Sequence, residues 1–350
     1  MKDPIGIVEA AYAFDAPDEG AWLARLTEVV RDNLPSPPVA IAYAYRIEKR
    51  GDAPWIAPRS VTTVGASPEM GAAFLQPPPF EPSAFARMQT LLTAYHRSTG
   101  LRSGLAFVDS NPDMAGVARF YRQMFESQGF GDVLTLTVAD PTTDGCVLVL
   151  PVRTPLALAA ARRASWQRVA AHVCAGFRLR RKIETMRGAA TEEAILSPSG
   201  KVEHATGDAT EAGNRRAFRE AVLSAERSRG SLRKKAPEEA LELWRGLVSG
   251  RWTLLDRFES DGRRYLVAHR NDPEVPDPRA LTDRERQVVG YAVLGQSNKM
   301  IAYNLGIATS TVGVLLGRAA AKLGVKSRAE LLATYPTPAS VAGPPGGGDA

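Results

Sequence analysis

The sequence has little of what metal sites and disulfide frameworks need. Its 350 residues include two cysteines, Cys146 and Cys174, and four histidines, and no Cys-x-x-Cys pair is present. Two isolated thiols are typical of a protein in a reducing compartment. His172 and Cys174 are close in sequence, but residues two apart on a helix point in different directions. We therefore expect no metal site and no cofactor.

Long apolar runs and catalytic motifs are also absent. No stretch approaches the roughly 18 apolar residues of a membrane span, and the first residues lack the apolar core of a signal peptide. The phosphate-binding patterns GxxxxGK[ST] and GxGxxG do not occur, nor do the hydrolase patterns HExxH and GxSxG. We expect a cytoplasmic protein that contacts no membrane and is not an enzyme.

The charge that is present is distributed unevenly. The chain holds 44 basic and 38 acidic residues, and residues 151–187 alone contain nine basic residues and one acidic residue. We predict a long helix there, capped by Thr154 and Pro155 and ending near residue 187. Its start is expected to dock on a sheet and its end to pair with a second subunit. The basic run at 178–182 has two interpretations, a solvated helix end or a contact with DNA phosphates or an acidic partner.

The part of the chain before residue 273 mixes helical and strand patterns, so we expect an α+β architecture. Helices are predicted by apolar spacing, and strands by alternation and by turn residues. The predicted helices are 20–31, 83–98, 113–127, 210–228 and 237–249, and the predicted strands are 39–47, 133–138, 146–150, two within 194–204, 252–258 and 263–269. The strand pairs at 133–150, 194–204 and 252–269 are expected to form hairpins.

The order of these elements resembles known sensory folds. Residues 1–187 resemble a GAF-type sensory or dimerisation domain, and residues 188–272 resemble a smaller PAS-like module. This resemblance implies a small-molecule ligand in the N-terminal part. The tryptophans are expected to anchor cores, although Trp55 lies between Pro54 and Pro58 and has the alternative of lining a pocket.

The C-terminal region contains signals for four short helices. Thr282 and Glu285 form a capping box, Ser297 can cap a second helix that Gly306 ends, and Thr309 or Ser310 can cap a third. Ser327 begins another capping box, for a fourth helix. A turn of three to four residues between the second and third helices is typical of a helix-turn-helix. We predict an all-α domain at 273–335, preceded by a linker at 271–278 and followed by a disordered tail at 336–350.

This region resembles the DNA-binding domain of LuxR-type transcriptional regulators. The resemblance rests on Leu-Thr-x-Arg-Glu-Arg at 281–286, Ser-Asn-Lys-x-Ile-Ala at 297–302, Leu-Gly-Ile at 305–307, Ser-Thr-Val at 310–312 and Lys-Leu-Gly-Val at 322–325. It implies that the third helix enters the major groove of double-stranded DNA and that the protein acts as a homodimer, with RNA polymerase as a further partner. The residues implied to contact DNA are Asn298, Lys299, Thr309, Ser310, Thr311, Gly313, Val314, Gly317, Arg318, Lys322, Lys326 and Arg328.

The sequence departs from the family pattern on the third helix. Gly313 and Gly317 stand where the family often has basic residues, and Leu315 stands where histidine is common. Arg318 is then the only charge on the face expected to meet bases. Two interpretations remain. The glycines permit close approach of DNA or of another helix, or the sequence of this face has changed because it is no longer selected for reading bases. We predict a DNA-binding transcriptional regulator, with a protein-interaction regulator that binds a partner through this face as the alternative.

Overall fold

The computed structural model describes most of the chain. The described residues are 1–35, 38–50, 53–66, 71, 81–112, 115–185, 192–258, 262–273, 281–323, 325 and 327–334. The predicted boundary at residues 187–188, most of the predicted linker and the predicted tail at 336–350 lie outside them, so these predictions remain open.

A five-stranded antiparallel sheet organises the N-terminal half. Its order is β2-β1-β5-β4-β3. The strands are β1 (Ala40–Arg50), β2 (Ala53–Val64), β3 (Gly100–Ser103), β4 (Asp132–Ala139) and β5 (Asp144–Val152). The predicted hairpin of β4 and β5 is confirmed, because Asp-Pro-Thr-Thr-Asp-Gly supplies the turn between two apolar runs. β2 and β3 were not predicted, since prolines interrupt the first and the second is only four residues long.

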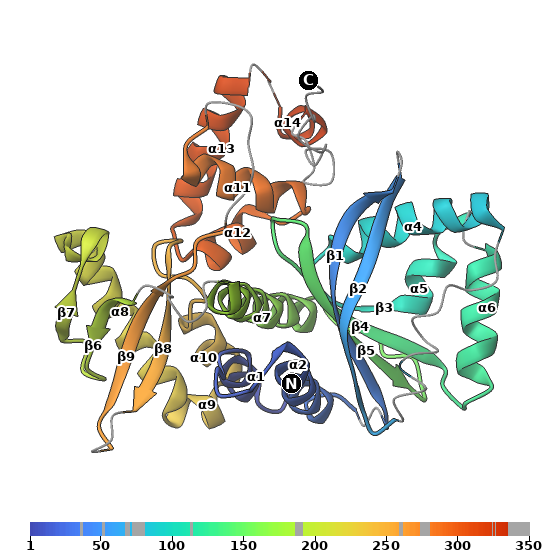
Figure 1. Ribbon diagram of the computed structural model, residues 1–350, viewed down its shortest axis with the longest axis horizontal. Coiled ribbons are helices and arrows are strands. Elements are labelled where there is room, and N and C mark those ends of the chain that lie inside the picture. Colours follow the sequence, from blue (N-terminus) through green and yellow to red (C-terminus); the bar gives the residue numbers. More distant parts are fainter. Residues whose placement is uncertain are drawn as a thin grey trace, which may run out of the picture.

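Each face of this sheet packs on its own layer of helices. Alternating side chains such as Ala42, Leu134 and Leu148 face one core, and Tyr43 and Val147 face another. Figure 1 shows one group of helices on one side of the sheet and a second group on the other. The first layer is α1 (Pro4–Ala11), α2 (Glu19–Asp32) and α7 (Ala160–Thr185); the second is α4 (Pro82–His96), α5 (Gly104–Asp109) and α6 (Ala115–Glu126).

Helix α7 begins later than its sequence predicts. It starts at Ala160, and Thr154 and Pro155 stand before it in non-helical chain. Leu156 and Leu158 are half-buried against the main core, while the residues between and beside them are exposed. This alternation belongs to extended backbone, so the predicted cap at Thr154 is wrong because packing of the two leucines overrides the local capping signal.

Two arginines in the last third of α7 are buried inside the molecule. Arg178 and Arg180 are only 7% and 4% exposed. Arg178 donates to Asp140, and Arg180 donates to the carbonyls of Ala13 and Ala16. Both interpretations of the basic run are therefore wrong for these two arginines, while the pairing of this helix end with a second subunit stays a prediction. Acidic and carbonyl groups distant in sequence neutralise the charge, which no local pattern reveals.

A second antiparallel sheet, of order β7-β6-β9-β8, follows α7. Both predicted hairpins are confirmed. The strands are β6 (Glu192–Leu196), β7 (Val202–Ala205), β8 (Trp252–Phe258) and β9 (Arg264–Arg270), and the helices are the short 3-10 helix η2 (Gly207–Thr210), α8 (Ala212–Arg229), α9 (Ser231–Lys235) and α10 (Pro237–Leu243). Phe218 of α8 packs edge-to-face on Trp252 of β8 and closes this core.

Helix α10 is shorter than the predicted helix over 237–249. It ends at Leu243 because Trp244 adopts an extended backbone and inserts into the main core beside α1 and α7. Ala240 and Leu241 belong to the same core, and Arg233 forms ion pairs with Asp3 and Glu9. Segments before and after α7 thus share one hydrophobic core.

The C-terminal region folds into the four predicted helices. They are α11 (Asp283–Val293), α12 (Asn298–Leu305), α13 (Thr309–Leu323) and α14 (Arg328–Thr334). The capping box of Thr282 and Glu285 is present, and Ser297 accepts from the N–H of Met300. Within the described residues no single helix is long and apolar enough to cross a membrane; α12 and α13 qualify only as a pair, which is bent by 105°.

Candidate nucleic-acid interface

Helix α13 presents one face to the core and the opposite face to solvent. Val312, Leu316 and Ala319 are buried against α11 and α12 at the spacing of one helical face. The face predicted from sequence lies outward: its residues Ser310, Gly313, Val314, Gly317, Arg318 and Ala321 are all exposed. Among the described residues, Val314 is one of few large apolar side chains with substantial exposure, at 52%. An exposed helix of this kind can enter a groove.

The two glycines of this face touch no other part of the molecule. A Cβ atom added at Gly313 or Gly317 would meet no described atom within 4 Å outside the helix. Neither residue has the positive φ that favours glycine. Within the described residues the glycines therefore serve no internal packing, and their surface is free to meet a partner.

The basic side chains on and beside α13 differ in whether they form ion pairs within the protein. No ion-pair partner is found for Arg318 among the described residues. Lys322 instead donates to the buried carboxylate of Glu285 over 2.7 Å. Burial opposes ionisation of Glu285, but the hydrogen bonds from Lys322 and Thr282 outweigh it and hold the pKa of Glu285 below its ordinary range. Lys322 thus fastens α13 to the N-terminus of α11.

The remaining predicted contacts lie at two neighbouring helix starts. Arg328 donates to the side chain of Asn298 and to the carbonyl of Gln296, so α14 and α12 are joined there. The ammonium of Lys299 is largely exposed, 3.8 Å from Glu242. Thr309, Ser310 and Thr311 are exposed in the first turn of α13. Lys326 lies outside the described residues.

The turn between α12 and α13 packs closely against the backbone around Leu247. Gly306 ends α12 in the left-handed conformation, with φ of 62°. A Cβ atom there would lie 1.9 Å from the carbonyl oxygen of Leu247, closer than atoms can approach. Two constraints therefore require glycine at this position: the positive φ angle and the close contact with the Leu247 carbonyl.

Comparison with known proteins identifies this helical unit. The family described as "Bacterial regulatory proteins, luxR family" matches residues 279–334. Residues 279–334 are a LuxR-family regulatory domain. The chain is 33% identical over 95 residues to the HTH-type transcriptional regulator MalT of Vibrio campbellii, and 35% identical over 77 residues to MalT of Vibrio cholerae. These alignments cover 27% and 22% of this chain and only 10% and 8% of the MalT proteins.

Two solved structures align over a larger part of the chain. Escherichia coli SdiA has 11% sequence identity and a TM-score of 0.32, over 94% of each chain. SdiA in complex with octanoyl-rac-glycerol has 10% identity and the same TM-score, over 94% of this chain and 91% of that one. A likeness of this size does not define the N-terminal fold. The GAF-type and PAS-like resemblances stay predictions.

The LuxR-family domain is attached to the N-terminal core by a chain of buried hydrogen bonds. The hydroxyl of Tyr303 in α12 donates to the backbone carbonyl of Leu241 over 2.7 Å, or to that of Trp244 over 2.9 Å. Its one proton is thereby used, so the oxygen accepts from Nε2 of His172 in α7, 2.7 Å away. Nδ1 of His172 then accepts from the hydroxyl of Tyr12, at 3.1 Å. Burial lowers the pKa of His172 to about 3, which keeps the imidazole neutral.

A buried arginine makes the second attachment. Arg178 of α7 donates to Asp140 over 2.5 Å, to the backbone carbonyl of Asn271 over 3.0 Å and to the hydroxyl of Tyr291 in α11 over 2.9 Å. It therefore ties the β4–β5 turn of the sheet and the LuxR-family domain to one helix. Asn271, at the start of the predicted linker, is itself fully buried and donates to the carbonyl of Ala175.

Sequence reasoning did not find these attachment residues. Tyr12, His172, Arg178, Tyr291 and Tyr303 are separated by up to 291 positions, and each has a common structural explanation when seen alone. The only available signal was a polar or ionisable group on an otherwise apolar helix face, as at His172 between Trp166 and Phe177. Such a group needs a partner when it is buried, but the sequence does not say which one.

The described residues contain no cluster of three or more metal-ligating side chains. Cys146 and Cys174 are both buried, and burial raises the pKa of each thiol; for Cys174 it reaches about 12. Neither thiol is therefore ionised or reactive at neutral pH.

Proposed function

We propose that this protein is a DNA-binding transcriptional regulator in which the LuxR-family domain binds double-stranded DNA through α13. The N-terminal region acts as a sensory or dimerising body, and the residues that contact DNA are those predicted from the sequence. In this role the protein works in the cytoplasm as a homodimer, has RNA polymerase as a further partner, and performs no catalysis.

The observation that supports the proposal most is the exposure of the α13 face. Its side chains lie outward over the whole length from Ser310 to Ala321, although the domain is docked through α11 and α12. Docking therefore uses the helices that precede α13 and leaves the groove-binding helix accessible. The exposed hydroxyl groups of Thr309, Ser310 and Thr311 at the start of α13 suit phosphate contacts.

The face also implies an unusual mode of binding. Arginine and lysine make the commonest base contacts, and Arg318 is the only such residue on it. Two glycines allow the helix backbone to approach the groove floor more closely than a longer side chain would. We expect the affinity for DNA to be low compared with other specific protein–DNA complexes. Recognition would depend on DNA shape and on apolar contact of Val314 with thymine methyl groups.

The test is selection and titration with the full chain. Duplexes of about 30 base pairs are selected from a random-sequence pool, long enough for two half-sites one helical turn apart. We expect a selected duplex to bind at least about a hundredfold more tightly than a scrambled duplex, with affinity falling as salt rises. Failure to enrich any sequence, together with no duplex binding at low salt, would contradict the proposal.

A companion variant distinguishes DNA from a protein partner. Gly317→Lys places a cation on the exposed face, where nothing in the described structure obstructs it. If the face meets phosphates, duplex affinity should rise and the salt dependence should steepen. If instead DNA binding is absent in both proteins, the alternative of a protein-interaction regulator, favoured by the exposed Val314, takes its place.

A further inference from the structure

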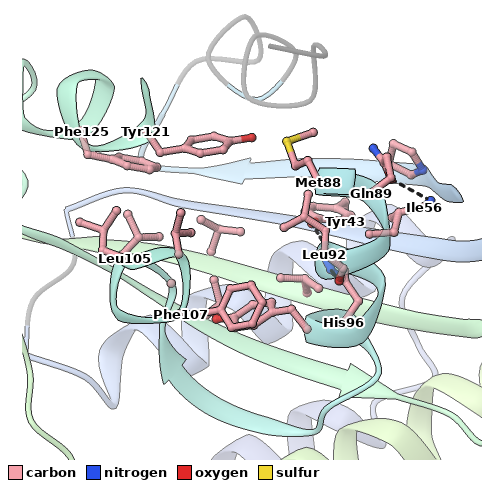
Figure 2. Close-up of a pocket in the computed structure, with 18 of the residues that line it drawn as sticks. Tyr43, Ile56, Met88, Gln89, Leu92, His96, Leu105, Phe107, Tyr121 and Phe125 are labelled. Carbon is pink, nitrogen blue, oxygen red and sulfur yellow. Dashed lines mark hydrogen bonds between the residues drawn. The ribbon is translucent and has the colours of Figure 1, made fainter. Parts of the chain in front are cut away.

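A cavity lies on the face of the five-stranded sheet that carries Tyr43 and Val147. It has a volume of about 200 Å³ and lies between the sheet and helices α4, α5 and α6. Figure 2 shows side chains from both layers converging on it. Apolar and aromatic groups make most of its wall, among them Met88, Leu92, Leu105, Phe107 and Phe125.

No charged side chain lines this cavity among the described residues. Its one imidazole, His96, has a defined tautomer. Nδ1 of His96 donates to the carbonyl of Leu92 over 2.7 Å, so Nε2 is the acceptor for the hydroxyl of Tyr43, 2.8 Å away. Burial lowers the pKa of His96 to about 4, so this pair is neutral at physiological pH. A buried ionic ligand would therefore find no counter-charge here.

One polar side chain that lines the cavity, Gln89, uses its acceptor, but not its donor, within the described part of the protein. Gln89 is 8% exposed, and its carbonyl oxygen accepts from the N–H of Ile56 over 3.3 Å. No partner for its amide nitrogen is found among the described residues. Figure 2 shows Gln89 beside Met88 at one end of the group and Tyr121 across from them. The amide N–H of Gln89 is therefore available to donate to a ligand acceptor in the cavity.

We propose that this cavity binds an uncharged small molecule built on a single ring, with a hydrogen-bond acceptor such as a carbonyl oxygen that receives the amide N–H of Gln89. The ring packs among the aromatic and aliphatic side chains. The oxygen of Tyr43 still has a lone pair to accept from a ligand hydroxyl. Carboxylates, phosphates and amines are excluded because the wall has no opposite charge.

The size of the cavity supports one ring rather than an extended molecule. An apolar cavity of about 150 Å³ is large enough to hold benzene. The additional volume here accommodates one or two short substituents. This inference does not depend on DNA binding, because it concerns the opposite face of the sheet from α7 and the LuxR-family domain.

The experiment uses the full chain and three probes of similar size. These are acetophenone, which is neutral and has an acceptor, benzoate, which is charged, and ethylbenzene, which has no acceptor. Binding is measured by ligand-observed NMR titration. We expect acetophenone to bind saturably, at least about tenfold more tightly than benzoate and severalfold more tightly than ethylbenzene.

Variants then locate the site. Gln89→Leu should remove the preference for acetophenone over ethylbenzene while leaving ethylbenzene binding intact, and Leu105→Trp should remove binding of both by filling the cavity. Gln123→Leu, on the exposed side of α6, is the matched control and should change nothing. Absence of saturable acetophenone binding to the natural chain, equal binding of benzoate, or an unchanged preference in Gln89→Leu would each overturn the proposal. None of these results depends on the duplex titration, so the two proposals fail separately.

Discussion

At the scale of single residues, the molecule places several polar groups in its interior and pairs them with residues distant in sequence. His172 and Arg178 lie six residues apart on α7 and are both buried, yet one is neutral and the other charged. Arg178 keeps its charge because Asp140 lies against it, and the charge of Asp140 outweighs burial and raises the pKa of the guanidinium. The surrounding groups, and not the residue types alone, decide these charges.

The glycines of the LuxR-family domain differ in what they contribute to stability. Gly313→Ala and Gly317→Ala should each stabilise the protein by about 1 kcal/mol, because alanine favours a helix interior and the space beside both residues is open. Gly306→Ala should destabilise it, since the new Cβ would meet the carbonyl of Leu247. Urea unfolding measures all three. Destabilisation by Gly313→Ala would show that this glycine has a packing partner in the folded protein.

The buried histidines predict a loss of stability in mild acid. The pKa of His172 is lowered to about 3, so the folded state stays neutral while the unfolded chain takes up a proton below about pH 6.5. Stability is thus full above pH 6.5 and falls as the pH decreases towards 3. At pH 5 this costs about 2 kcal/mol for His172, and His96 behaves in the same way.

The matched variants are His172→Gln and the exposed His204→Gln. Urea unfolding at pH 7.5 and pH 5 should show a smaller pH-dependent loss in His172→Gln than in the natural chain. His204→Gln should retain the full loss, because His204 is exposed on β7. Equal pH dependence in all three proteins would mean that His172 is not held neutral.

At the scale of elements, α7 is the axis of the molecule. It contacts the first sheet, helices α1 and α10, and α12 of the LuxR-family domain, and Figure 1 shows it between the two sheets. The element order and most boundaries follow from local patterns, as the confirmed hairpins and the four C-terminal helices show. The start of α7 and the end of α10 do not, because Leu156, Leu158 and Trp244 are placed by packing on a distant core.

The candidate site was predictable in part for the same reason. The outward face of α13 follows from helical spacing alone, with Val312, Leu316 and Ala319 marking the inner face. The pairing of Arg328 with Asn298, and of Lys322 with Glu285, needed the structure because these residues come from different helices. The attachment of the domain through Tyr303 and Tyr291 had no local signal.

Truncation of Arg178 should expose its role at the junction of three elements. Arg178→Met leaves Asp140 buried without its counter-charge, so we expect a loss of about 3 to 5 kcal/mol in the free energy of unfolding. Arg216→Met is the control, because the pair of Arg216 with Glu220 is largely exposed, and its loss should stay below about 1 kcal/mol. Similar small losses in both variants would show that the buried Arg178 pair contributes no more to the free energy of unfolding than an exposed pair does.

The hydroxyl of Tyr303 should also contribute measurably. Tyr303→Phe removes the acceptor of His172 and leaves the carbonyl of Leu241 without that donor, which should cost about 1 to 3 kcal/mol. Tyr265→Phe on β9, where no hydroxyl hydrogen bond is found among the described residues, should be close to neutral. Native-state hydrogen exchange should show faster exchange in α12 for Tyr303→Phe alone. Unchanged exchange would indicate that α12 is held by apolar packing only.

At the scale of the whole molecule, the net positive charge is a poor guide to the DNA surface. Most of the basic segment 151–187 lies within α7, where Asp140, Asp144 and Asp272 pair with Arg178, Arg181 and Lys182. The face of α13 has one charge and is nevertheless exposed on a domain fixed to the core by two buried attachments. The proposed DNA contact therefore rests on the exposure of α13 and on the LuxR-family match at 279–334, and not on net charge.

The most direct test compares Val314→Glu with Leu223→Glu in the full chain. Both residues are exposed apolar side chains on helices, 52% and 39% exposed, so the two variants add the same charge at sites of similar exposure. We expect Val314→Glu to weaken binding of the selected duplex at least about tenfold through repulsion of phosphates, and Leu223→Glu to leave it unchanged. Equal affinities for the two variants would contradict the claim that the α13 face binds DNA.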